Sequence, residues 1–461
     1  MKKAFILLPD GVGLRNFAFG KFYEEGIHQN FDITFWNNTN FPISNLGYKE
    51  INLELGKPRS ISDLYKRAKI IIELKQNVRN FKNDVFLSYL SSKNYKNSKE
   101  IIKTIFVSFL VFFYNSSKGI IKIKKKLHQL ERNSKYYLKS KQTLQKEKPV
   151  IIFLTNQRPL TAVAPLLAAQ DLGIPTVTFI FSWDNLPKGT LVVSSDFYFV
   201  WSNFMKSELL KYYPSVKENQ IKVTGTPQFE CHYNTVFKTK FLFFKEHNLD
   251  IKKKYICFSG DDITTSPNDQ YYLEDLAKTV RRLNEKGENI GIIYRKCPVD
   301  FSNRHIDVYK KYKNEIVLID PKWKNLGNGW NRVMPLPEDL TLLANTVHHT
   351  EMVINVGSSM VFDFVSQNKP CAFLNYNTIK KSSEDWSIKK IYKYIHFKSM
   401  PNTNAVLWIN SSEEMQNIIL QVLNNTIHLE STKEWYNKIV EFPQDKASQR
   451  IWLEINKLVC T

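Results

Sequence analysis

The sequence has few cysteines, and none of them stand in a paired spacing. Its 461 residues contain five, Cys231, Cys257, Cys297, Cys371 and Cys460. An odd number of widely separated cysteines without a CxxC pair argues against both a disulfide framework and a zinc site. We therefore expect a cytoplasmic protein that holds no metal ion.

Long hydrophobic runs are also missing. The N-terminal run of apolar residues stops at Pro9-Asp10, too early for a signal peptide, and is interpreted as a first strand. The segment 104–114, TIFVSFLVFFY, is the most apolar stretch, but a transmembrane helix needs roughly 20 such residues. The sequence therefore predicts no membrane-spanning helix.

Acidic residues are scarce relative to basic ones, with 44 Asp and Glu against 65 Lys and Arg, for a net charge of +21. The excess is concentrated in residues 118–148, where eleven basic residues face two acidic ones, a balance of 11 − 2 = +9. A polybasic segment beside the apolar segment 104–114 favours docking on an anionic membrane surface over the alternative of a solvated charged face. No helix-turn-helix, RNP or zinc-finger pattern accompanies the charge, so nucleic acid is not expected as a partner.

The order of apolar runs and turn signals predicts an α/β protein with two Rossmann-like domains facing a central cleft. The N-terminal domain is expected over 1–235, with a helical, lysine-rich insertion over 60–148. The C-terminal domain is expected over 236–440, followed by a helix over 441–461 that packs back on the first domain. Continuous rather than alternating apolar runs indicate parallel strands that are buried on both faces. The strands expected are AFILLPD, FDITFW, PVIIFLTN, TVTFIFSWDN, FYFVWS, YICFSGDD, NIGIIYRKCP, EIVLIDP, MVINVGSS and PCAFLNY.

Polar clusters follow several of these strands, and ligands of such sheets bind at the carboxyl ends of strands. The turn Gly357-Ser358-Ser359 stands between an apolar strand and a helix-like segment. A helix N-terminus presents backbone N–H groups and a positive dipole, which suit a phosphate. The alternative is that Ser358 or Ser359 caps an ordinary helix.

Several motifs follow one another along the chain: Asp196 before a strand, Val200-Trp201-Ser202, the stretch VTGTPQF over 223–229, Arg295-Lys296-Cys297-Pro298, and Ser358, Ser359 and Asp363. In this order they resemble bacterial GT-B glycosyltransferases of surface-polysaccharide assembly. The C-terminal half also resembles the CDP-glycerol glycerophosphotransferases of teichoic-acid synthesis. Cys297 departs from this pattern, because related enzymes often have a histidine there and a thiol is a poor substitute for an imidazole donor.

The resemblance implies a donor site that binds a nucleotide diphosphate without a metal or other cofactor. Arg295 and Lys296 would supply positive charge, and Gly260 would let the donor approach the backbone closely. Asp363 either binds a ribose hydroxyl or braces the turn that precedes it. The full set of expected donor-binding residues is Gly260, Arg295, Lys296, Gly357, Ser358, Ser359 and Asp363.

On the acceptor side, Asp184 in FSWDNLPKG follows a buried strand and is a candidate catalytic base. It could equally shape its loop through Asx-type hydrogen bonds. Asp10 is the second candidate base, and Arg15 and Asn16 are expected to contact the acceptor or a phosphate.

These features together predict a glycosyltransferase that moves a sugar from a nucleotide-sugar donor to a surface glycan or lipid-linked acceptor. It would work as a peripheral protein on the inner face of the cytoplasmic membrane. The alternatives are a transferase of CDP-activated polyol phosphates and a nucleotide-sugar epimerase, which shares the fold and needs no acceptor.

Overall fold

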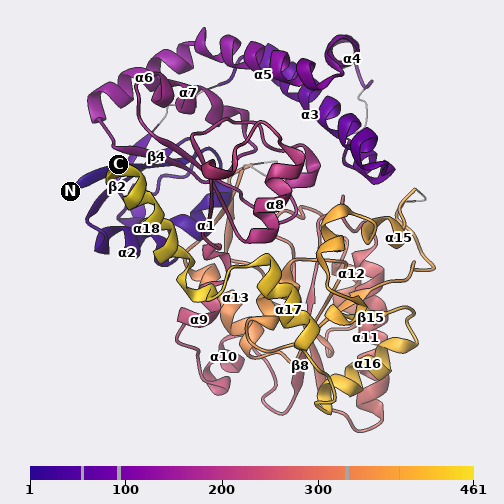
Figure 1. The fold of residues 1–461 in the computed structure, drawn as a ribbon. Coiled ribbons are helices and arrows are strands. Elements are labelled where there is room, and N and C mark those ends of the chain that lie inside the picture. The colour runs from indigo at the N-terminus through magenta and orange to yellow at the C-terminus, as the bar shows by residue number, and fades with distance from the viewer. Residues whose placement is uncertain (53–56, 91–94, 328–331, 384, 461) are drawn as a thin grey trace. The chain divides into compact units, whose positions relative to one another are not determined.

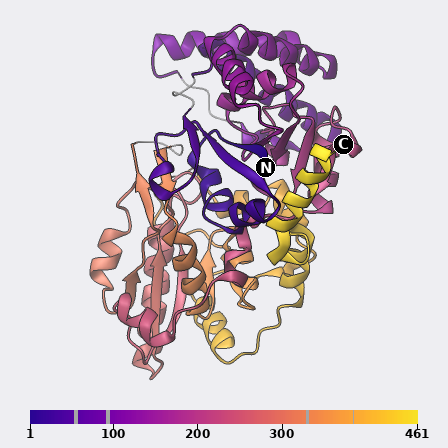
Figure 2. The same ribbon diagram turned by 90° about the vertical axis from the view of Figure 1, so that its left-hand side faces the viewer.

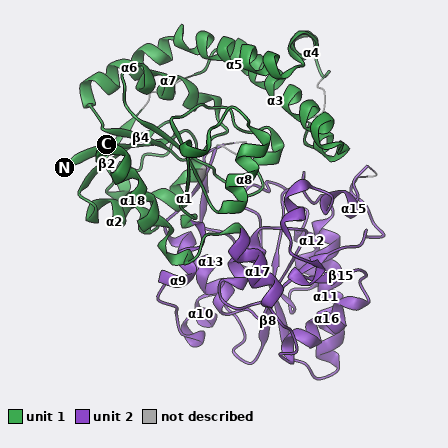
Figure 3. Ribbon diagram, viewed as in Figure 1, with its two compact units in different colours: residues 1–227, 439–461 green, residues 228–438 purple. Residues whose placement is uncertain are grey.

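The computed structural model describes residues 1–52, 57–90, 95–327, 332–383 and 385–460 (Figure 1). The chain divides into two compact units, and Figure 3 colours them separately. Unit 1 comprises residues 1–227 and 439–461, and unit 2 comprises residues 228–438. The sequence analysis placed the corresponding boundaries after residues 235 and 440.

Unit 1 is built on a seven-stranded parallel sheet in the order β3-β2-β1-β4-β5-β6-β7. Parallel strands that are covered on both faces require continuous apolar runs, and the central strands β1 and β4 are accordingly buried over most of their length. The strands are β1 Lys2–Leu8, β2 Phe31–Asn37, β3 Glu50–Asn52, β4 Ile151–Leu154, β5 Thr176–Phe179, β6 Phe197–Val200 and β7 Ile221–Val223.

The helices of unit 1 include a group from α3 to α6 that separates β3 from β4 in the chain. In both Figure 1 and Figure 2 this group gathers at the top of the unit. The helices are α1 Leu14–Phe17, α2 Lys21–His28, α3 Ser60–Phe81, α4 Ser98–Tyr114, α5 Ser117–Arg132, α6 Lys135–Glu147, α7 Val163–Asp171, α8 Asn203–Tyr212 and α18 Ala447–Cys460.

The C-terminal helix α18 packs against α2, which lies near the N-terminus of the chain. The Trp452 indole is fully buried and donates a hydrogen bond to the Phe22 carbonyl at 2.7 Å. A side chain at Gly26 would collide with the Trp452 ring, because a Cβ there would lie 2.4 Å from it. The helix expected over 441–461 thus forms part of unit 1 in this structure.

Unit 2 has a six-stranded parallel sheet in the order β10-β9-β8-β13-β14-β15, with a separate antiparallel pair, β11 and β12. The strands are β8 Lys254–Ser259, β9 Ile290–Arg295, β10 Ile316–Leu318, β11 Trp323–Asn325, β12 Val333–Pro335, β13 Val353–Asn355, β14 Cys371–Leu374 and β15 Leu407–Ile409. The helices are α9 Cys231–Asn234, α10 Lys240–Glu246, α11 Asp269–Glu285, α12 Ile306–Lys311, α13 Glu338–His348, α14 Met360–Val365, α15 Ile388–Ile391, α16 Glu414–Leu423 and α17 Glu430–Ile439.

The ten strands expected from the sequence are all present in the two sheets. Strands β3, β7 and β15, which stand at sheet edges, and the pair β11 and β12 were not expected from the sequence. Each missed strand has only three residues and at least one partly or fully exposed position, apart from the wholly buried β12. Such short segments carry no periodic signal that would distinguish them from loops.

Candidate functional site

Each sheet has one point where the chain reverses its direction of travel across the strands. In unit 2 this topological switch point lies between β8 and β13, and in unit 1 it lies between β1 and β4. Open α/β sheets bind ligands outside the carboxyl ends of the strands at such points. A ligand is therefore expected at these two switch points.

In unit 2, strand β13 ends in the turn Gly357-Ser358-Ser359. Gly357 has φ +67°, which favours glycine, and a Cβ there would lie 2.8 Å from the Phe397 ring. The Ser358 N–H donates to Asn355 Oδ1 at 2.8 Å, which fixes the turn. Ser359 is the N-cap residue of α14 but makes no side-chain cap hydrogen bond. The Ser358 hydroxyl accepts from the Met360 N–H at 3.4 Å, so the capping alternative is met by Ser358 and not by Ser359.

On the other side of the same switch point, β8 is followed by Gly260 and Asp261. A Cβ at Gly260 would lie 2.9 Å from the Tyr294 hydroxyl, so a neighbouring side chain already occupies the space beside this glycine. The buried Asp261 carboxyl accepts a hydrogen bond from the Val356 N–H, which ties the end of β8 to the turn after β13. Burial and then the nearby Asp269 carboxylate raise the pKa of Asp261 well above its usual value. The raised pKa favours the protonated form of Asp261, which would not repel a phosphate.

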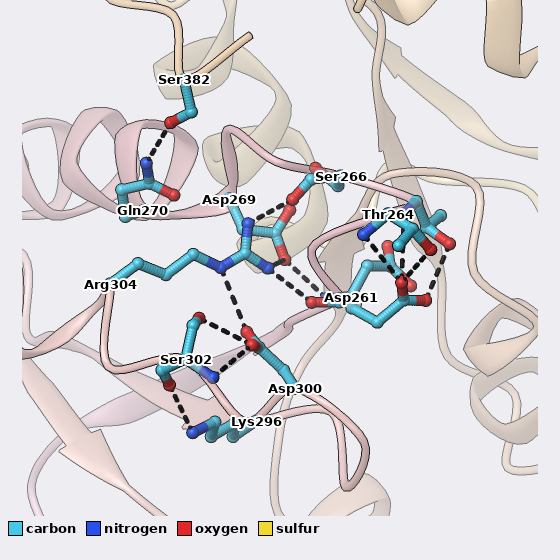
Figure 4. Close-up of polar contacts among 12 residues, drawn as sticks. Asp261, Thr264, Ser266, Asp269, Gln270, Lys296, Asp300, Ser302, Arg304 and Ser382 are labelled. Atoms are coloured by element: carbon cyan, nitrogen blue, oxygen red, sulfur yellow. Dashed lines mark hydrogen bonds and ion pairs between the residues drawn. The ribbon is translucent and has the colours of Figure 1, made fainter. Parts of the chain in front are cut away.

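Arg304, which the sequence analysis did not single out, organises the loops beside Asp261 (Figure 4). Its guanidinium donates to the main-chain carbonyls of Asp261, at 2.6 Å, and of Ser266. It also donates to the Asp300 carboxylate at 3.1 Å and lies 3.7 Å from the Asp269 carboxylate. The only sequence signal was the spacing of Asp300 and Arg304 by four residues in an irregular segment, which does not reveal the contacts with the two distant loops.

Arg295 and Lys296 lie at the end of β9 and have different environments. The Arg295 side chain is buried and donates to Asp339 Oδ1 at 2.8 Å, within an ion pair in which both partners are almost inaccessible. Lys296 is half-buried and donates one hydrogen bond to the Ser302 carbonyl at 2.7 Å. A lysine ammonium has three donors, so two remain for a ligand. Burial raises the pKa of the neighbouring Cys297 thiol to about 12, which keeps it neutral.

Asp363 lies on the buried side of α14. Its carboxylate pairs with His232 of α9, and only 3% of the residue is exposed. This contact corresponds to the bracing alternative for Asp363. His232 was not recognised as a functional or structural partner from the sequence, because 131 residues separate the two.

At the switch point of unit 1, β1 and β4 are each followed by polar residues. Asp10 accepts a hydrogen bond from Asn156 Nδ2 at 2.9 Å, which links the loops after the two strands. A Cβ at Gly13 would lie 2.5 Å from Thr155 Oγ1, so only glycine allows this close approach. The turn leads into α1, where Asn16 is buried and Arg15 is half-buried.

Asp184 lies in the loop after β5, and donors from its own loop surround it. Its carboxylate accepts from Ser182 Oγ at 2.6 Å, from Asn185 Nδ2 at 2.8 Å and from the Lys188 ammonium. Gln157, from the loop after β4, bonds both the Phe181 N–H and Asn185 Oδ1 and so attaches this loop to the switch point. The geometry matches the loop-shaping alternative for Asp184.

Unit 1 also contains a cavity of about 510 Å³ between α3, α5 and the segment 211–215. Apolar residues such as Ile120, Ile121 and Tyr212 line it together with polar groups that include Glu73 and Lys124. Burial lowers the pKa of Lys124 to about 8. The sequence analysis did not foresee this cavity, because its walls come from three separate segments.

The described residues contain neither a metal-ligand group nor a membrane-spanning helix. No three His, Cys, Asp or Glu side chains in these parts of the chain form a group that could hold a metal ion. No helix within the described ranges is both long and apolar enough to cross a membrane.

No family model and no curated protein matches the sequence, whereas many solved structures match the fold. The S. aureus MnaA–UDP structure has a TM-score of 0.52 and 14% identity, over 100% of this chain and 97% of that one. A putative UDP-N-acetylglucosamine 2-epimerase from Listeria monocytogenes has a TM-score of 0.55 and 13% identity, over 99% and 96%.

A glycosyltransferase from Rickettsia africae has a TM-score of 0.51 and 10% identity, over 100% of this chain and 99% of that one. Identities this low show a common fold only. Together with the two parallel sheets, they establish that this chain has the GT-B type of fold that the sequence analysis expected.

Proposed function

We propose that this protein is a glycosyltransferase that moves a sugar from a nucleotide-sugar donor to a surface glycan or lipid-linked acceptor. The observation that carries the proposal is the switch point of unit 2. There the segments that follow β8 and β13 are joined by a hydrogen bond, in which the Asp261 carboxyl accepts from the Val356 N–H. This is the position at which open α/β sheets bind nucleotides.

The donor diphosphate would bind at the turn Gly357-Ser358-Ser359. The Ser359 hydroxyl, which caps no helix, would donate to a phosphate oxygen. Lys296 would contribute positive charge through its remaining donors, stabilising the leaving diphosphate. Arg295 would also contribute positive charge, from a guanidinium that its ion pair with Asp339 holds in place.

The two candidate bases for deprotonation of the acceptor hydroxyl, Asp10 and Asp184, lie in unit 1. Asp10 is the better placed of the two candidates, because it lies at the switch point and accepts from Asn156. Asp184 is the second candidate, and its three donors within one loop favour a structural role. Arg15 and Asn16, directly after the same turn, would contact the acceptor or its phosphate.

The cavity of unit 1 supports an acceptor with an apolar part. Its isoleucines and Tyr212 offer surface for a hydrocarbon chain, and Lys124 offers a cation for an anionic head. Such an acceptor would place the enzyme at the inner face of the cytoplasmic membrane. Five free cysteines are consistent with a reducing compartment.

An epimerase of nucleotide sugars is the second candidate function. The likeness of fold to the Listeria protein, whose name is that of a putative UDP-N-acetylglucosamine 2-epimerase, favours it. A CDP-activated polyol-phosphate donor remains an alternative substrate for the transferase.

A panel of UDP-, GDP-, CDP- and CMP-activated donors tests the proposal through protection of the protein against heating. A ligand at about 100 times its dissociation constant stabilises a protein by about 2.7 kcal/mol. Ser359→Ala should weaken binding of the matching nucleoside diphosphate by about 0.5–1.5 kcal/mol, measured by isothermal titration. Unchanged affinity would move the phosphate site away from this turn.

The donor that protects the protein against heating then distinguishes a glycosyltransferase from an epimerase. Incubated alone and followed by NMR, it should stay unchanged if the protein is a transferase and should change configuration within the sugar if the protein is an epimerase. If no donor in the panel protects the protein, both functions are wrong.

A further inference from the structure

Helix α4 carries a row of large apolar side chains that face solvent. The row consists of Ile102, Ile105, Phe109, Phe112 and Phe113, each more than half exposed, with Phe112 at 80%. The first four are separated by three, four and three residues, so they form one stripe along the helix. A contiguous exposed apolar stripe of this kind marks an interaction surface.

The opposite side of α4 is firmly packed. Val107, Leu110 and Val111 belong to a buried cluster with Ala68 and Ile72 of α3 and Ile123 of α5. The helix is also capped at its start, where the Asn97 side chain accepts from the Glu100 N–H. The packing of α4 therefore keeps the apolar stripe exposed to solvent, and the exposure does not result from a loosely attached helix.

Helix α5, which follows directly, presents a basic face. Lys118, Lys122, Lys125 and Lys126 are exposed and form no ion pair with any residue that the structure describes. Glu131, the acidic residue of this helix, is fully buried. A two-residue link joins α4 to α5, and it is so tight that a Cβ at Gly119 would overlap the Tyr114 carbonyl. The tight link holds the start of α5 directly beside the end of α4, and both helices lie at the top of unit 1 in Figure 1.

We infer that α4 and α5 form a docking surface for a bilayer that contains anionic lipids. Phe109, Phe112 and their neighbours enter the boundary between headgroups and acyl chains, and the lysines of α5 bind lipid phosphates. α4 lies along the surface, since a helix of 17 residues with charges in its first turns does not cross a bilayer.

The charge of this surface favours a bilayer over a second copy of this chain as its binding partner. A symmetric contact through α4 would bring two basic α5 faces together, and like charges in an interface oppose association. An anionic membrane neutralises both the α5 face and the surrounding +9 balance of residues 118–148. The inference goes beyond the proposed function, and its test needs no nucleotide.

Vesicle flotation with the full chain tests the inference. Binding is expected to vesicles that contain phosphatidylglycerol in phosphatidylcholine, with at least tenfold weaker binding to phosphatidylcholine alone. Raising the salt concentration should weaken the binding, because the Debye length falls from about 10 Å at 0.1 M to about 3 Å at 1 M. Equal binding to both vesicles, or none, would overturn the inference.

Variants of α4 and α5 test whether vesicle binding occurs through this surface. The changes Phe109→Ser and Phe112→Ser together should reduce vesicle binding more than tenfold, whereas the control Val236→Ser, which is 90% exposed on unit 2, should not. Lys118→Gln, Lys122→Gln and Lys126→Gln together should also reduce it at least tenfold. The matched control removes the same charge through Lys252→Gln, Lys286→Gln and Lys313→Gln, at exposed positions of unit 2.

A spectroscopic variant reports insertion directly. Because the chain has nine tryptophans of its own, the emission of Phe112→Trp is compared with that of the wild type, and the difference should shift to the blue and be quenched by brominated acyl chains on anionic vesicles. Emission that stays unchanged while the protein binds would overturn insertion of α4. Self-association that depends on Phe112, without vesicle binding, would instead identify a second copy as the occupant and also overturn the inference.

Discussion

His232 Nε2 of α9 lies 2.8 Å from Asp363 Oδ1 of α14, and both side chains are buried within unit 2. Gln367 Nε2 lies 3.0 Å from the other ring nitrogen of His232 and 3.0 Å from the Ala344 carbonyl of α13. One polar network thus joins three helices of this unit. The helix that follows the turn Gly357-Ser358-Ser359 is therefore anchored at Asp363.

Asp363→Ala should destabilise this anchor. Removal of one partner from a buried, hydrogen-bonded pair costs about 3 kcal/mol, because the other polar group remains buried without its partner. Hydrogen exchange should become faster in peptides that cover α9 and α14. The exposed Asp307→Ala provides the control, and exchange as slow as in the wild type would show that the pair contributes little.

Arg295→Met should lower stability more than it lowers nucleotide affinity. The substitution leaves the Asp339 carboxylate buried without its ion pair, at a cost of about 3–5 kcal/mol. Urea denaturation measures this cost, with the exposed Arg282→Met as the matched control. A variant with wild-type stability and lost affinity for the nucleoside diphosphate would instead support a direct phosphate contact.

Asp261→Asn should be tolerated, although it removes a potential charge. Burial and the Asp269 carboxylate raise the pKa of this carboxyl well above its usual value, which favours the protonated form, and asparagine replaces that form with similar shape. Affinity for the stabilising nucleotide should change less than threefold, which is under about 0.7 kcal/mol. Asp261→Ala removes the acceptor for the Val356 N–H and should weaken binding. A large loss with asparagine would indicate that an ionised carboxylate is needed.

Glu208 of α8 should make unit 1 less stable as the pH rises. Burial raises the pKa of Glu208 to about 8, above the ordinary value of 4.5. The stability that the protonated form contributes is fully present below pH 4.5 and is lost as the pH rises through 8. Glu208→Gln stays neutral, so at pH 8 it should exceed the wild type by on the order of 3 kcal/mol.

Urea midpoints at pH 5 and pH 8 measure the effect of Glu208→Gln. The control Glu218→Gln changes an exposed glutamate of the same unit and should leave the pH dependence as in the wild type. Parallel pH profiles for the wild type and Glu208→Gln would contradict an unusually high pKa at Glu208.

Asp10→Asn and Asp184→Asn should show which of the two aspartates is the catalytic base and which one stabilises its loop. If Asp10 accepts the acceptor's proton, Asp10→Asn should lower kcat at least about a hundredfold while donor affinity stays unchanged. Asp184→Asn should mainly lower stability, because it weakens the hydrogen bonds with Ser182 and Lys188. The reverse result would make Asp184 the base.

The sequence by itself determined the α/β class and the order of the principal strands. Buried parallel strands require continuous apolar runs, and these are local features that can be recognised directly, as in β1, β8 and β13. Gly260 after β8 and Gly357 after β13 were also recognised directly, because each follows an apolar run in the sequence. The short edge strands were missed, because three residues carry too little pattern.

Only the tertiary structure decided which side chains meet. The sequence left Asp184 open between a base and a loop brace, and only the structure shows that Ser182, Asn185 and Lys188 surround its carboxylate. Arg295 was expected at a phosphate, but its partner Asp339 lies 44 residues away in the chain. Contacts between residues far apart in sequence depend on how helices pack on the sheet, and no local pattern records them. For α4, the apolar composition was evident from the sequence, but only packing against α3 and α5 determined which side chains face solvent.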